Sequence, residues 1–156
     1  MAPLPASPPA RPSPAPPPPP AISHASAVIA EGEVEQLTTQ RRIETDEDQY
    51  LKIISAKTGA LIAAACRMGA ILGGLSPEKE EALASFGVKT GIVFQMADDI
   101  LDYMADEGDL GKKICKDLEE GKITLPLLYL LRSAGGEEVL EIKKIIREPV
   151  LLLGIL

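Results

Sequence analysis

The sequence predicts an all-α fold built from packed antiparallel helices. Ala, Leu, Ile, Glu and Lys dominate the middle of the 156-residue chain, and these residues favour helices. From about residue 25 onward, apolar residues recur at helical spacing. No segment shows the strict apolar–polar alternation of a half-buried strand. Helix start and stop residues then divide the chain into several helices joined by short connections.

The chain divides by composition into three parts. Residues 1–20 contain 11 of the 14 prolines, and proline has no N–H to donate to a helix or a sheet. We therefore expect residues 1–25 to be a disordered, polyproline-like segment. Residues 26–147 form the expected helical domain. Residues 148–156 are apolar with no polar face, and we interpret them as a truncated tail.

The first half of the domain predicts two helices. One runs from about residue 25 to residue 40. Thr45 is the expected N-cap of the next, because Asp46, Glu47 and Asp48 in its first turn would interact favourably with the helix dipole. That helix should continue to the glycine pair 73–74, a typical C-terminal stop.

The second half predicts three more helices. Ser76 and Pro77 are start signals for a helix that ends near residue 105. A polar loop over 106–120 follows it. Thr124 and Pro126 start a helix to about Arg132, and the glycine pair 135–136 separates this helix from an amphipathic one over 137–147.

The helix over 77–105 carries an acidic stripe within apolar surroundings. At 100° per residue, four polar side chains share one face: Gln95, Asp98, Asp99 and Asp102. Most other positions nearby are apolar, so we expect the helix to be buried and its stripe to face a cavity, a cleft or a partner. Stacked carboxylates repel one another unless a cation compensates them, and Mg²⁺ binds oxygen ligands of this kind. A solvated acidic face is the alternative interpretation.

Composition also bears on partners and location. The net charge of −7 argues against nucleic acid as the main partner. Arg67 interrupts the most apolar run, residues 59–75, so we expect no transmembrane segment. Cys66 and Cys115, the only cysteines, form neither a metal-type pair nor a disulfide framework. A reducing cytoplasm is therefore the expected location.

An ordered set of motifs resembles the trans-isoprenyl diphosphate synthases, and within them the long-chain, octaprenyl-type bacterial branch. The set begins with Phe94-Gln95-x-x-Asp98-Asp99-x-x-Asp102, which looks like the second aspartate-rich region of that family. It continues with Gly111-Lys112, Asp117 and Glu120-Gly121-Lys122-x-Thr124-Leu125-Pro126. The segments Glu31–Leu37 and Lys57-Thr58 also lie where the family has similar residues. The resemblance covers roughly residues 26–147 and implies a partial isoprenoid-synthase-type helical bundle.

The resemblance implies a prenyltransferase of isoprenoid biosynthesis. In that reaction an allylic diphosphate ionises, isopentenyl diphosphate attacks the carbocation, and a proton is lost. Asp98, Asp99 and Asp102 would hold Mg²⁺ directly or through water, with Asp117 supporting them. The expected contacts to the allylic diphosphate, which make up the catalytic and substrate-binding set, are Lys57, Thr58, Gln95, Lys112 and Lys122.

The chain also departs from the family pattern. The family has a first aspartate-rich motif followed by an arginine pair, and this sequence has neither, since Arg41-Arg42 follows no aspartates. We therefore expect a partial synthase that is incomplete or inactive alone. The family's dimers suggest a homodimer or pairing with a complete synthase. Two alternatives are a non-catalytic partner subunit and a helical interaction module that binds a basic partner.

Overall fold

The computed structural model describes residues 19–104 and 115–148, and these residues form helices and turns with no strand among them. The predicted all-α fold class is confirmed. The helices, with the π-helix η1, are α1 (Pro19–Thr39), α2 (Glu47–Ile54), η1 (Ser55–Gly59), α3 (Ala60–Leu72), α4 (Pro77–Met104), α6 (Lys116–Glu119), α7 (Leu125–Ser133) and α8 (Gly136–Arg147).

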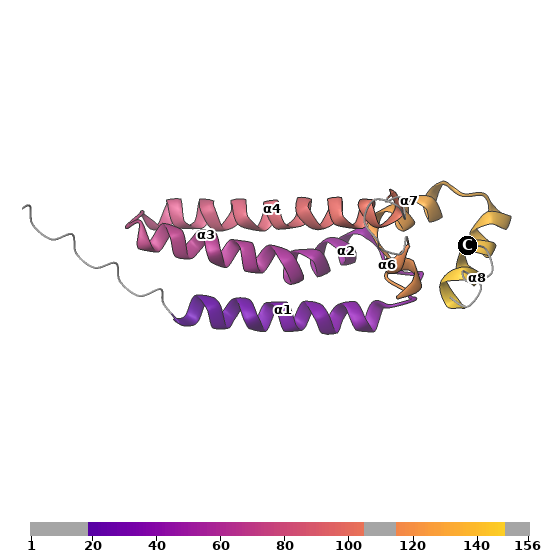
Figure 1. Ribbon diagram of the computed structural model, residues 1–156, viewed down its shortest axis with the longest axis horizontal. Coiled ribbons are helices and arrows are strands. Elements are labelled where there is room, and N and C mark those ends of the chain that lie inside the picture. Colours follow the sequence, from indigo (N-terminus) through magenta and orange to yellow (C-terminus); the bar gives the residue numbers. More distant parts are fainter. Residues whose placement is uncertain (1–18, 105–114, 149–156) are drawn as a thin grey trace, which may run out of the picture.

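Three long helical rods lie side by side and alternate in direction (Figure 1). The middle rod consists of α2, η1 and α3 in continuous succession. It contacts α1 on one side and α4 on the other. The short helices α6, α7 and α8 gather at the end of the molecule where α4 finishes. The candidate site residues considered below lie toward this end of the rods.

The N-terminal boundary differs from the prediction. Helix α1 begins at Pro19, so residues 19–25 are helical and do not belong to a disordered segment. Pro19 and Pro20 occupy the first turn, where an N–H has no helical acceptor, so proline does not interrupt the helix there. Residues 1–18 lie outside the described residues, as do residues 149–156 of the expected apolar tail.

The start of α2 also differs by one residue from the prediction. Asp46 is the N-cap, and its carboxylate accepts a hydrogen bond of 2.8 Å from the Gln49 N–H. The hydroxyl of Thr45, the predicted cap, donates instead to the Arg42 carbonyl at 2.7 Å. Thr45 is buried, and this contact fixes the turn between α1 and α2. Similarly, α6 lies in a stretch that was expected to be a loop.

The middle rod contains a π-helical turn where a regular α-helix was expected. Directly after η1, the Ala60 N–H donates to the Ser55 carbonyl, five residues back. A π-turn inserts one extra residue into a helix and changes the faces on which the following side chains lie. Here it contains Lys57, Thr58 and Gly59.

Small residues allow α4 and the middle rod to approach closely. A Cβ atom added to Gly91 would lie 2.6 Å from the Gly59 Cα, and one added to Gly87 would lie 2.6 Å from the Ala63 Cα. Both distances are shorter than the separation of two non-bonded carbon atoms in a real structure. The helix backbones therefore touch directly at these positions, and no larger residue fits without moving a helix.

The main apolar core lies near the end that carries α7 and α8. It combines residues from distant parts of the sequence: Tyr50, Ile54, Ile123, Leu127, Leu128 and Ile146. This core fixes the segment 122–124 against α2. The polar site described below therefore rests directly on the most completely buried part of the chain.

Helix α4 is not buried around its circumference, contrary to the prediction. Along one side it exposes a stripe of large apolar residues, termed here the α4 stripe, consisting of Phe86, Val93, Phe94, Leu101 and Met104, which are 58–74% exposed. The reason is topological, because α4 lies at the edge of the three-rod layer and contacts the middle rod on one side only. The glycines and Asp99 face inward, and the stripe faces away.

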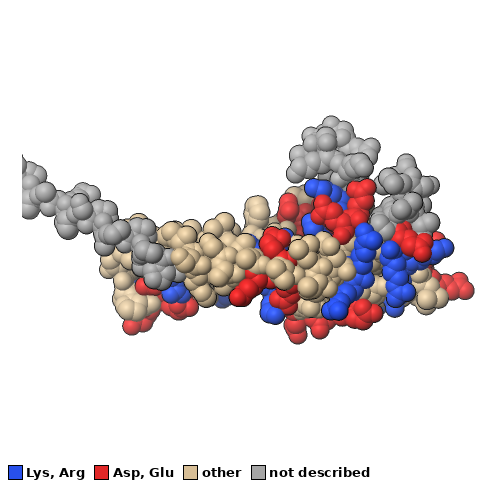
Figure 2. Space-filling model, turned by 90° about the horizontal axis from the view of Figure 1, so that it is seen from below, with Lys and Arg blue, Asp and Glu red and all other residues tan. Residues whose placement is uncertain are grey.

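Charge is distributed unevenly over the surface. On the face shown in Figure 2, Lys, Arg, Asp and Glu crowd the end that carries α6 to α8, become sparser along the middle of the rods and form a smaller group at the opposite end. By length and composition alone, the continuous helix Glu47–Leu72 is long and apolar enough to cross a membrane. Helices in the cores of soluble proteins share these properties, so no membrane span follows from this observation.

The close helix contact gives a stability prediction. Gly91→Ala should lower the free energy of unfolding by about 1–3 kcal/mol, because the new methyl group overlaps the Gly59 backbone. Gly69→Ala is the matched control, since Gly69 also lies within a helix but has no atom within 4 Å of the added Cβ. In the control the free energy of unfolding should rise by about 0.5–1 kcal/mol, because alanine is more favourable than glycine within a helix. Urea unfolding followed by circular dichroism measures both, and equal effects would contradict the packing argument.

Candidate functional site

A pocket of about 80 Å³ lies between α1, the middle rod, α4 and the turn that follows α6. Residues from all four regions line it, and most of them are polar. Six of the residues singled out from the sequence are among them: Lys57, Gln95, Asp98, Asp99, Asp117 and Lys122. Residues as far apart in the sequence as Lys57 and Lys122 therefore line the same pocket, and it is the tertiary fold that brings them together.

A continuous chain of hydrogen bonds joins the middle rod to α4. The Thr58 hydroxyl donates to the Gln95 side-chain oxygen at 2.9 Å, and the Gln95 amide nitrogen donates to Asp99 at 2.9 Å. The Tyr50 hydroxyl donates to the other Asp99 oxygen at 2.8 Å. Each donor is matched by one acceptor, so the side chains hold one another in fixed orientations.

Asp99 is the buried carboxyl of the site, with 4% of its surface exposed. Burial raises its pKa above the usual value for aspartate, and this effect outweighs the hydrogen bonds from Gln95 and Tyr50, which lower it. Asp117 and Asp98 raise it further. Burial also raises the pKa of the Tyr50 hydroxyl, as does its hydrogen bond to Asp99, so Tyr50 remains a donor.

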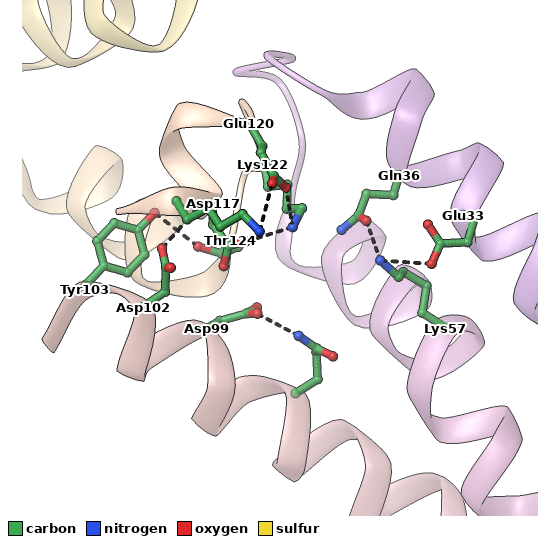
Figure 3. Close-up of polar contacts among 12 residues, drawn as sticks. Glu33, Gln36, Lys57, Asp99, Asp102, Tyr103, Asp117, Glu120, Lys122 and Thr124 are labelled. Carbon is green, nitrogen blue, oxygen red and sulfur yellow. Dashed lines mark hydrogen bonds and ion pairs between the residues drawn. The ribbon is translucent and has the colours of Figure 1, made fainter. Parts of the chain in front are cut away.

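Lys57 reaches the pocket from η1 on the side nearer α1 (Figure 3). Its ammonium donates to the Gln36 side-chain oxygen at 2.6 Å and lies 3.1 Å from a Glu33 carboxylate oxygen. The side chain is 22% exposed and lines the pocket. Helix α1 therefore supplies the partners that orient this cation.

Lys122 approaches from the opposite side of the pocket (Figure 3). Its ammonium lies 2.8 Å from an Asp117 oxygen and 2.8 Å from a Glu120 oxygen. Burial alone would lower the pKa of Lys122, but these two hydrogen-bonded carboxylates raise it above the usual lysine value. The ammonium is therefore charged throughout the physiological pH range.

Asp102 fixes the chain segment that carries Asp117. Its side-chain oxygen accepts a 3.0 Å hydrogen bond from the Asp117 N–H, and its backbone carbonyl accepts one of 2.9 Å from the Cys115 N–H. Close by, the Tyr103 and Thr124 hydroxyls lie 3.3 Å apart, and burial raises the pKa of Tyr103 to about 12. One carboxylate oxygen of Asp102 thus already accepts a hydrogen bond from the protein itself.

Two of the predicted residues remain, Asp98 and Lys112. Asp98 is exposed and lines the pocket. Lys112 lies outside the described residues. Over residues 19–104 and 115–148, no three Asp, Glu, His or Cys side chains come together as a set that would hold a metal ion. The three aspartates of the stripe therefore do not form a closed cage.

Several pocket residues were not predicted from the sequence to belong to the site. Among them are Gln36, Thr39, Thr45, Tyr50 and Thr124. Tyr50 lies seven residues before Lys57, two helical turns along the same face, so helical spacing could have indicated it. The others come from turns or from another helix, and only tertiary packing places them at the pocket.

The arrangement suits a polyanion that arrives with a hard cation. Two ammonium groups, Lys57 and Lys122, flank the pocket from opposite sides. Between them lie carboxylates that would repel an anion unless a cation intervened. A ligand that combines phosphate oxygens with a divalent metal ion would satisfy both kinds of group.

A sequence comparison identifies the family. The model described as Polyprenyl synthetase matches residues 20–150. The chain belongs to the polyprenyl synthetase family. This result confirms the resemblance described from the motifs, and the match includes both Lys57-Thr58 and the aspartate stripe.

Individual members of the polyprenyl synthetase family give the extent of the similarity. Octaprenyl diphosphate synthase of Escherichia coli is 42% identical over 127 residues, covering 81% of this chain and 39% of the relative. Heptaprenyl diphosphate synthase component 2 of Bacillus subtilis is 36% identical, covering 78% of this chain and 35% of the relative.

A solved structure shows the same fold. The polyprenyl synthase from Caulobacter crescentus, described as complexed with calcium and isoprenyl diphosphate, matches with a TM-score of 0.76 and 43% identity. The match covers 81% of this chain and 38% of that one. The chain therefore spans about two fifths of the length of the relatives it matches.

The buried carboxyl gives a pH prediction. A raised pKa means that the folded state binds the Asp99 proton more tightly than the unfolded state. The stabilisation from Asp99 is therefore present below the usual aspartate pKa of about 3.9 and is lost as pH rises toward the raised value. Asp99→Asn has no carboxyl group to titrate and should not lose this stabilisation. As pH rises above about 3.9, the free energy of unfolding of the variant should therefore increase relative to that of wild type.

Urea unfolding of both proteins at several pH values between about 3 and 7 measures this difference, because the other groups titrate equally in the two. Glu141→Gln, at an exposed carboxylate of α8 outside the hydrogen-bond chain, is the control and should show no such pH dependence. A difference that does not depend on pH would contradict the assignment of a raised pKa to Asp99.

Proposed function

We propose that this chain supplies the diphosphate-binding half of a prenyltransferase site in isoprenoid biosynthesis. The substrates would be an allylic diphosphate and isopentenyl diphosphate. The observation that carries the proposal is the pocket itself, in which Lys57 and Lys122 flank the carboxylates of α4. Membership of the polyprenyl synthetase family supports this assignment, and chain length of the product is left open.

Each side chain has a proposed task. Lys57, Thr58, Gln95 and Lys122 contact the diphosphate of the allylic substrate, and Lys112 joins them from the segment beyond α4. Two ammonium groups favour the charge that develops on the diphosphate as the allylic C–O bond breaks. The bonding electrons leave with the diphosphate, isopentenyl diphosphate forms the new C–C bond, and a proton is lost.

The donor set fits Mg²⁺ that is shared with the substrate. Mg²⁺ commonly takes one or two carboxylates and fills its remaining positions with water and phosphate oxygens. Asp98 is the exposed carboxylate, while Asp99 and Asp102 each accept hydrogen bonds from the protein. We propose that Asp98 binds the ion most directly, that Asp99 and Asp102 complete its surroundings, and that Asp117 orients Lys122. When bound, the ion would neutralise the leaving diphosphate.

A relative gives independent support for this chemistry. The Caulobacter structure, which shares 43% identity with this chain, is described as holding calcium and isoprenyl diphosphate. Calcium and magnesium are both hard cations that prefer oxygen ligands. The two free cysteines, Cys66 and Cys115, are consistent with a reducing cytoplasm as the proposed location.

Binding and turnover are separate parts of the proposal. The chain spans about two fifths of its relatives' length, and its sequence contains one aspartate-rich motif where the family has two. We propose that this chain binds the allylic diphosphate with Mg²⁺ but requires further helices for condensation. Those helices would come from a second chain or from additional sequence.

The binding half of the proposal predicts the effect of Asp98→Ala. Removing the exposed carboxylate should weaken Mg²⁺-dependent binding of farnesyl diphosphate about tenfold or more, because a charge-assisted contact is worth about 1.5–3 kcal/mol. Calorimetric titration with and without Mg²⁺ measures the effect. Glu81→Ala is the control, since Glu81 is an exposed carboxylate of the same helix paired with Arg67 away from the pocket. Equal affinities in the two variants would exclude Asp98 from the site.

The α4 stripe favours a second candidate function, that of a helical partner subunit. Five large apolar side chains exposed along one helix form a surface that normally contacts another protein. The Bacillus relative is described as a component of its synthase. In this alternative the chain packs its α4 stripe against a complete synthase or a second copy and takes no part in the chemistry.

The partner function predicts the effect of Val93→Glu. A charge at the centre of the α4 stripe should weaken association about tenfold or more, because an unpaired charge would be desolvated in the complex. Sedimentation velocity of the chain, alone and with a complete octaprenyl-type synthase, measures this. Leu140→Glu, at an equally exposed apolar position on α8, should leave association unchanged. If both variants associate like wild type, the α4 stripe is not the interface.

A further inference from the structure

We propose that the turn between α1 and α2 is a positioning element for the diphosphate site, with Arg41 holding the turn that carries Lys122. This inference rests on the proposed function, because it concerns how one of the diphosphate-binding cations is placed. It assigns a role to a residue outside the pocket. The two turns involved are residues 39–45 and residues 120–124.

The turn that carries Lys122 is tightly constrained. Gly121 has a φ of +77°, in the left-handed region that favours glycine. The Gly121 N–H donates to the Leu118 carbonyl at 3.0 Å, and the Lys122 N–H donates to the Asp117 carbonyl at 2.8 Å. These contacts turn the chain back over α6, so that the Lys122 ammonium reaches Asp117 and Glu120.

The opposing turn meets this one through its backbone. Arg41 has a φ of +59°, which is uncommon for a residue with a side chain. In this conformation its N–H donates to the Gly121 carbonyl at 2.7 Å. A left-handed backbone is strained for a residue with a side chain, and this conformation persists only where the surroundings impose it. Here the left-handed conformation of Arg41 allows its N–H to form the hydrogen bond with the Gly121 carbonyl.

Both ends of the Arg41 turn are fixed in the interior. The Arg42 N–H donates to the Thr39 carbonyl at 3.0 Å, and the Thr45 N–H donates to the Arg42 carbonyl at 3.0 Å. Thr39 and Thr45 are 5% and 6% exposed and line the pocket. A displacement of this turn would therefore change the pocket wall and the Lys122 turn together.

The two turns leave no space between them. A Cβ atom added to Gly121 would lie 2.5 Å from the Arg41 Cγ and 2.9 Å from its Nε. Gly121 therefore combines a left-handed backbone, which favours glycine, with a close approach to the Arg41 side chain, which would have to move to admit a Cβ atom. Gly74 has a similar φ of +66° but no atom within 4 Å of an added Cβ, so it separates the two requirements.

The test compares two substitutions at one position. Arg41→Gly and Arg41→Pro both remove the guanidinium group, but only proline removes the N–H and excludes a positive φ. Arg41→Gly should bind farnesyl diphosphate with Mg²⁺ within about twofold of wild type, whereas Arg41→Pro should bind about tenfold more weakly as one charge-assisted contact is displaced. Equal affinities would overturn the proposal.

A double-mutant cycle separates positioning from a general loss of stability. If Arg41 acts through Lys122, the effect of Arg41→Pro on affinity should disappear in a Lys122→Met background, while its effect on unfolding should persist. An undiminished loss of affinity in that background would overturn the proposal. Should Arg41→Pro fail to fold, Gly121→Ala replaces it in the same Lys122→Met comparison, with Gly74→Ala as the control for alanine at a positive φ.

A readout without ligand distinguishes failure of this inference from failure of the proposed function. Amide hydrogen exchange at Lys122 should be slow in wild type and Arg41→Gly and at least about tenfold faster in Arg41→Pro or Gly121→Ala. If farnesyl diphosphate does not bind but exchange differs in this way, the proposed function fails and the coupling between the turns stands. Identical exchange rates in all variants would overturn the coupling itself.

Discussion

The direct backbone contact between α4 and the middle rod is the constraint on which the rest of the structure depends. Gly59 and Gly91 bring the two helices together at the level of the π-turn. This approach places Thr58 within hydrogen-bond distance of Gln95 and, through Gln95, orients the buried Asp99. The close packing and the polar network are therefore one feature, since a wider helix separation would break the first link of the hydrogen-bond chain.

The sequence predicted the helices from local patterns, and six of the candidate site residues that it indicated line the pocket. Helical spacing placed Gln95, Asp98, Asp99 and Asp102 on one face, and the family motifs added Lys57 and Lys122. The π-turn was not predictable from spacing, because the i+5 bond depends on how η1 packs against its neighbours. The exposed side of α4 was not predictable either, since composition does not reveal that a helix lies at the edge of a layer.

The two cations of the pocket are held by quite different means. Lys57 projects from a helix and is oriented by Glu33 and Gln36 of α1. Lys122 projects from a turn whose shape depends on contacts with the turn after α1. Helix α1 and the turn that follows it therefore influence both sides of the pocket, although few residues of this region were considered functional from the sequence.

The carboxylates beside the two lysines also determine how the pocket would respond to its surroundings. Glu33, Asp117 and Glu120 already neutralise the ammonium groups, so an incoming anion competes with partners that belong to the protein. An anion that arrives without a metal ion would gain little by that exchange, because the carboxylates it displaces would be left without a partner. We therefore expect these internal ion pairs to favour a ligand that brings its own compensating cation.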